Sequence, residues 1–82
     1  MNRIQDIIPD SKLVEFHVGN FGAMSMRDVV RDGVVKSALG YDYGQTMFMI
    51  LREHKLITMD KNLTKKGKRY ARALWRDGEF RL

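Results

Sequence analysis

Residues 42–67, DYGQTMFMILREHKLITMDKNLTKKG, contain the clearest structural signals in this chain. A turn of about 100° per residue separates residues 43–54 into two sides. The apolar side holds Gly44, Met47, Phe48, Ile50, Leu51 and His54, and the polar side holds Gln45, Thr46, Met49, Arg52 and Glu53. Asp42, followed three residues later by Gln45, resembles a capping box. We predict an amphipathic helix over about 43–54, with His54 as a core histidine.

The periodicity changes after Lys55. Residues 56–59 and 63–64 are rich in apolar and β-branched side chains, and they flank Asp60-Lys61-Asn62, which is typical of a turn. This pattern predicts a short two-stranded hairpin over about 56–64. Thr64 can then cap a final helix over about 65–77, which Gly78 ends.

A second amphipathic helix is predicted over about 26–39. Ser25 is a good N-cap, Asp28 suits the positive end of a helix, and Gly40 is a natural C-terminal stop. Gly33 lies within the apolar stripe and costs helix stability, which leaves open a break into two shorter helices. Only residues 40–42 separate this helix from the next, a spacing that predicts a helix-turn-helix.

The N-terminal 20 residues fit two structures. Pro9 separates a short turn from the following segment, which Asp10 or Ser11 can begin as a helix over about 11–18. Val14, Phe16 and Val18 also alternate with more polar residues, as in a strand. We prefer the helix and leave the strand open.

Composition narrows the class of protein. The 82 residues suit one domain, over 1–82, and the absence of cysteine excludes disulfides and Cys-ligated zinc. We find no signal peptide, no apolar run that would cross a membrane, and no catalytic, metal-binding or cofactor motif. We therefore expect a cytoplasmic protein that is not an enzyme. The net charge of +5 favours a polyanionic partner.

The charge is concentrated in the last helix. Its predicted inner side holds Gly67, Tyr70, Ala71 and Leu74, and its opposite side holds Lys65, Lys68, Arg69, Arg72 and Arg76. Cations on one helix face repel one another without a counter-anion. A solvated face is the simplest interpretation, but the clustering favours an anionic partner.

Two short motifs resemble a known superfamily. Arg52–Ile57 (REHKLI) and Leu63–Gly67 (LTKKG) are similar to the end of the recognition helix and the segment after the wing in winged helix-turn-helix regulators of the MarR, PadR and ArsR-like groups. The likeness covers about 25–76 and implies a mainly α fold with a small β-hairpin. It departs from the pattern in its very short wing, its longer second helix and its lack of long terminal helices.

The resemblance implies that residues 43–54 enter the major groove and that residues 60–62 form the wing. Carried over by position, the DNA contacts are Tyr43, Gln45, Thr46, Met49, Arg52 and Lys61. Glutamine pairs with adenine and arginine with guanine. Each of these residues could equally well be an ordinary solvated side chain on an exposed helix face or, in the case of Tyr43, a side chain that packs within the fold. The cations of the final helix complete the predicted site.

The sequence therefore predicts a protein that binds double-stranded DNA specifically, as a prokaryotic or phage transcription regulator. The alternative is a protein-interaction module, such as a phage-encoded inhibitor or a recombination accessory factor, whose basic face meets an acidic partner. An RNA-binding module is a weaker third choice because no exposed aromatic platform is evident. Trp75 and Phe80 either cap the core or form a homodimer contact, and we prefer the dimer.

Overall fold

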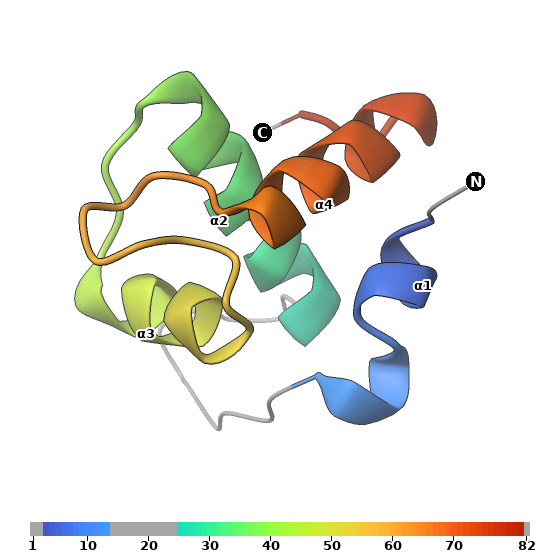
Figure 1. The fold of residues 1–82 in the computed structure, drawn as a ribbon, viewed down its shortest axis with the longest axis horizontal. Coiled ribbons are helices and arrows are strands. Elements are labelled where there is room, and N and C mark those ends of the chain that lie inside the picture. The colour runs from blue at the N-terminus through green and yellow to red at the C-terminus, as the bar shows by residue number, and fades with distance from the viewer. Residues whose placement is uncertain (1–2, 14–24, 82) are drawn as a thin grey trace.

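The computed structural model describes residues 3–13 and 25–81. Over these ranges the chain forms helices α1 (Ile4–Ile7), α2 (Met26–Leu39), α3 (Gln45–Glu53) and α4 (Lys65–Arg76), with a 3-10 turn at Asp10–Lys12. Helix α2 packs against both α3 and α4, and α1 packs against α4 (Figure 1). The fold is therefore a small helical assembly around α2.

Helix α2 starts and ends as predicted and runs without a break. The Ser25 hydroxyl accepts a hydrogen bond from the Asp28 amide at 3.1 Å, and Gly40 ends the helix with φ 77°. The break at Gly33 that the sequence left open is absent, because Gly33 allows close packing between helices. A Cβ there would lie 2.7 Å from Leu51 Cδ1 on α3, so the missing side chain lets α3 approach α2 closely.

Helix α3 is shorter than predicted and begins differently. Its N-cap is Gly44, which offers no side-chain cap, and Asp42 instead accepts a hydrogen bond from the amide of Tyr43. The C-terminal end has the hydrogen bonds of a Schellman motif: the amides of Lys55 and Leu56 bond to the carbonyls of Arg52 and Leu51. Lys55 takes the left-handed position with φ 58°, where glycine is usual.

The predicted hairpin is absent, and the predicted winged helix-turn-helix class is therefore wrong. Among residues 3–13 and 25–81 the structure has no strand; it has a single antiparallel bridge between Ile57 and Leu63. The Thr58 hydroxyl accepts hydrogen bonds from the amides of Asp60 and Asn62, so the loop is organised by a local side-chain turn. Across this segment backbone hydrogen bonds run from the Thr58 amide to the Asn62 carbonyl and from the Thr64 amide to the Leu56 carbonyl, which makes one bridge; an isolated two-stranded ladder is marginal in water.

Helix α4 is held against this connecting segment at its first turn. The Thr64 hydroxyl accepts a hydrogen bond from the Gly67 amide at 3.1 Å and donates one to the Lys55 carbonyl at 2.7 Å. A Cβ on Gly67 would overlap the Leu56 carbonyl oxygen. Glycine is therefore required for this contact between a helix and a backbone carbonyl.

Arg27 joins the N-terminal segment to the helices by hydrogen bonds. Its guanidinium donates to the Ile8 carbonyl at 2.7 Å, to Asp10 Oδ1 at 2.6 Å and to the Tyr70 hydroxyl at 3.0 Å. Of the predicted helix over 11–18, only residues 11–13 are described, and they form the end of the 3-10 turn Asp10–Lys12 and its C-cap rather than an α-helix. Residues 14–18 of that prediction, and the alternative strand, lie outside the described residues.

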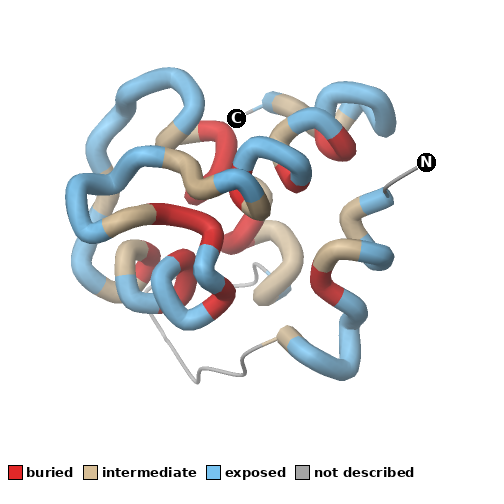
Figure 2. Tube along the Cα trace, in the orientation of Figure 1, coloured by how far each residue is buried: buried red, intermediate tan, exposed pale blue. Residues whose placement is uncertain are grey.

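The core lies where the inner sides of α2, α3 and α4 meet (Figure 2). Its fully buried residues are Ile8, Val29, Val30, Val34, Val35, Ile50, Leu51, Leu56, Ile57, Tyr70 and Leu74. Within the described ranges no helix has the length and apolar character needed to span a membrane.

Candidate functional site

The outer side of α4 gathers five cationic side chains. We call it the basic face, and it consists of Lys65, Lys68, Arg69, Arg72 and Arg76, all of which are exposed. None of them forms an ion pair or a side-chain hydrogen bond with any residue in 3–13 or 25–81. The predicted separation of α4 into an apolar inner side and a basic outer side is confirmed.

The positive charge of the basic face is not neutralised by acidic residues of α4 itself. The first turn of α4 contains no acidic residue, and its cations lie at the positive end of the helix dipole. Towards the other end, Arg69, Arg72 and Arg76 line a shallow hollow of about 50 Å³ with Ala73. Three guanidinium groups around one hollow present many N–H donors in fixed geometry, which suits phosphate or carboxylate oxygens.

The predicted contact residues of α3 are only partly available. Gln45 and Met49 are exposed, Met49 by 51%, and Thr46 is half-buried. Arg52 is exposed but turns back on the chain, because its Nη1 donates to the Ile57 carbonyl at 3.1 Å. The outer side of α3 is therefore mixed and nearly neutral.

Two further predicted contacts have internal partners. The Tyr43 hydroxyl is hydrogen-bonded to the Ser37 hydroxyl at 2.8 Å, which favours the packing role. Lys61 Nζ lies 3.0 Å from Asp42 Oδ1 and 5.1 Å from the centre of the Tyr43 ring, with the Phe48 ring also near. The ammonium group lowers the pKa of the Asp42 carboxyl through this hydrogen bond. Lys61 thus ties the 58–62 loop to the turn before α3.

The eleven predicted residues fall into two groups. One group surrounds α3 and the 58–62 loop, and the other lies along α4. In Figure 1, α3 lies at the lower left and α4 runs from the centre to the upper right, joined by residues 54–64; α4 packs against α1 and α2 rather than against α3. The structure therefore leaves the predicted residues in two separate groups.

Trp75 extends the surface of α4 with a large aromatic side chain. The residue is 72% exposed, and its ring contacts that of Phe80 edge to face, with ring centres 5.8 Å apart. Trp75 does not cap the core. The homodimer contact that we predicted for it stays a prediction.

Two buried groups have shifted acidity. His54 is 6% exposed, as expected for a core histidine, and burial lowers its pKa, with Lys66 adding to the effect. Burial also raises the pKa of Tyr70, whose hydroxyl accepts the hydrogen bond from Arg27. In the described part of the chain no cluster of three or more His, Cys, Asp or Glu side chains is arranged to hold a metal ion.

Comparison of the chain with protein-family models, with curated proteins and with solved structures finds no match. The chemistry of its own residues is therefore the basis for any functional conclusion.

Sequence reasoning missed a second group of charged residues, which meets only in the folded chain. Lys12, Glu53, His54, Lys55 and Lys66 line one pocket together with residues 7–9. The sequence partly indicated that Lys66 differs from the other cations of α4, because helical rotation places it outside the arc of the basic face. Its nearness to Lys12, 54 positions away, has no signature in the sequence.

Proposed function

We propose that the protein binds double-stranded DNA through the basic face of α4. The observation that supports this most strongly is the exposure of five cations on one helix side without an acidic partner in the described chain. Such an arrangement is electrostatically unfavourable alone and favourable against a polyanion, where condensed counterions are released. Phosphate contacts of this kind supply most of the affinity in protein–DNA complexes and carry no sequence information.

Sequence preference, and with it a role as a transcription regulator, is the finer part of the proposal. It is supported by Gln45, whose exposed amide on the first turn of α3 suits the N6 and N7 atoms of adenine. Arg52 supports it less, because one of its donors already bonds to Ile57. Affinity therefore depends on α4 and base discrimination on α3.

The decisive experiment measures fluorescence anisotropy of a labelled random duplex over a range of salt concentrations. If all five cations contact phosphates, the logarithm of the affinity falls against the logarithm of the salt concentration with a slope of about −4 to −5. The variant Arg69→Gln/Arg72→Gln is expected to reduce the size of this slope by about 2.

A matched control has the same net charge but leaves the basic face intact. Arg3→Gln/Lys36→Gln removes two cations from α1's N-cap and from α2, and it should keep the slope of the unchanged protein. Equal losses in both variants would mean that overall charge alone drives binding. Absence of binding at low salt would reject the proposal.

A second candidate is an acidic protein partner on the same helix, and Trp75 favours it. A tryptophan that is 72% exposed beside arginines is typical of the residues that dominate protein interfaces. Affinity purification with the wild type and with Trp75→Ala distinguishes the two. A partner that is retained by the wild type, lost with Trp75→Ala and unaffected by nuclease supports the acidic protein partner. Loss of all binding after nuclease treatment supports DNA binding.

A further inference from the structure

A pocket of about 380 Å³ lies between the N-terminal segment and the C-terminal end of α3, away from the basic face. Residues 7–9 and Lys12 form one wall, residues 53–55 form another, and Lys66 from α4 closes a third. Its volume is within the range of small-molecule sites in proteins. Three separate parts of the chain therefore converge on one space.

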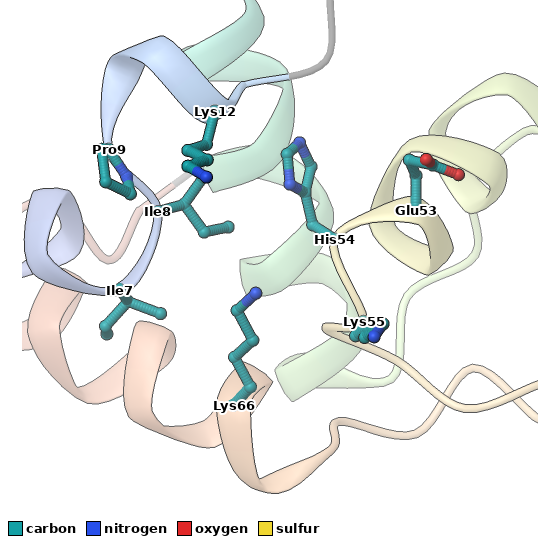
Figure 3. A pocket seen from close by; sticks show the side chains of 8 residues that line it. All are labelled: Ile7, Ile8, Pro9, Lys12, Glu53, His54, Lys55 and Lys66. Carbon is teal, nitrogen blue, oxygen red and sulfur yellow. The ribbon is translucent and has the colours of Figure 1, made fainter.

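The electrostatics of this pocket are one-sided. It contains three ammonium groups, from Lys12, Lys55 and Lys66, against one carboxylate, from Glu53. None of these four side chains forms an ion pair with another residue of the described ranges. Figure 3 shows the Lys12 and Lys66 ammonium groups and the His54 ring directed into the pocket, while the Glu53 carboxylate points away from them.

The opposite wall is apolar. Ile7, Ile8 and Pro9 offer aliphatic surface next to the two converging ammonium groups. An excess of cations without ion-pair partners favours an anionic head group, and the adjacent aliphatic surface favours a small apolar body. We propose that this pocket binds a small organic anion, a phosphate monoester with a compact apolar group, in which Lys12 and Lys66 hold the phosphate.

This site is independent of the proposed DNA binding, since none of its residues belongs to the basic face. His54 provides an internal reporter. Lys12 and Lys55 share the pocket with it, and Lys66 on α4, Arg27 on α2 and Glu53 on its own helix act electrostatically on the ring. An anion held between Lys12 and Lys66 adds negative charge beside the ring and raises the pKa of His54.

The test uses the whole chain and phenyl phosphate as the probe, with calorimetry for affinity and NMR for the imidazole titration. We expect saturable binding that is weaker for inorganic phosphate and absent for benzyl alcohol, together with a rise in the His54 pKa. Lys12→Ala and Lys66→Ala should each weaken binding about tenfold, because each removes one charge-assisted hydrogen bond.

Lys65→Ala is the matched control, because Lys65 is the neighbour of Lys66 but lies on the basic face. It should change affinity for phenyl phosphate less than twofold, as should Arg69→Gln/Arg72→Gln. Equal weakening by Lys65→Ala and Lys66→Ala would overturn the proposal, as would non-saturable binding. Displacement of phenyl phosphate by duplex DNA, with Lys66→Ala weakening both ligands equally, would assign the pocket to the DNA-binding surface and reject a small-molecule site.

Discussion

Helices α3 and α4 are both amphipathic, yet their outer sides are used differently. The cation on the outer side of α3, Arg52, is hydrogen-bonded to the Ile57 carbonyl, and nearby Lys61 is paired with Asp42. The cations on α4 have no such partners in the described chain. These two cations on and near α3, the helix that resembled a recognition helix, thus have partners within the protein. The cations of the basic face, without such partners in the described chain, lie on α4.

The two helices are also anchored by different glycines, and this is where the largest effect is expected. Gly67→Ala should lower the free energy of unfolding by about 3 kcal/mol or more, because its Cβ would overlap the rigid Leu56 carbonyl. Gly33→Ala should cost only about 1 kcal/mol, since the Leu51 side chain can shift and alanine favours the helix. Chemical denaturation of both variants measures this difference. Similar losses would show that the two glycines play the same role.

A second expected difference is that α3 contacts bases whereas α4 contacts phosphates. Selection of duplexes from a random library should enrich an adenine position with the unchanged protein and with Arg69→Gln. Gln45→Ala should lose that preference, worth about 1–3 kcal/mol, while its affinity for random DNA changes little. If no base is enriched with any protein, α3 does not read sequence and binding is limited to phosphates.

The end of α3 is sensitive to pH because His54 is buried there. Its pKa in the folded protein is lowered, so the unfolded chain binds more protons as the pH falls below the ordinary histidine value of about 6.5. Stability is therefore expected to be highest above that pH and to decline on acidification, by at most about 1.4 kcal/mol per pH unit for one site. Thermal unfolding at pH 7.5, 6 and 5 tests this. His54→Gln should flatten the decline, and an equal decline in that variant would assign the effect to another group.

The smallest effect concerns how the two helices end. Both have the hydrogen bonds of a Schellman motif, but α3 places Lys55 in the left-handed position and α4 places Gly78 there. Lys55→Gly should raise the free energy of unfolding by about 0.5–1 kcal/mol, and Gly78→Ala should lower it by about 1 kcal/mol. Denaturant titration of the pair would contradict this account if both changes had the same sign.

Local chemistry made several features predictable. The bounds of α2 follow from Ser25 and Gly40, the start of α4 follows from Thr64, and helical rotation correctly separated the buried and exposed sides of α3 and α4. The exposure of all five residues of the basic face could be read from the sequence for the same reason. Caps and helical periodicity act over three or four residues, so the sequence carries them directly.

Other features depended on contacts between distant residues. The residues after Lys55 have the composition of a hairpin, but the side-chain turn at Thr58 and the close approach of Gly67 to Leu56 leave room for one bridge. Arg52 was predicted to face DNA and instead donates to Ile57, since only the folded loop brings that carbonyl within reach.

The sequence by itself determined the three longer helices, their buried sides and the concentration of positive charge on the last of them. Only the tertiary structure decided that Arg27 joins three segments, that Lys61 is paired, and that Lys12 and Lys66 face one pocket. The physical reason is range. Helix propensity and capping are local free energies, whereas the partner of a charged side chain depends on how helices pack, and that follows from burial of the whole core.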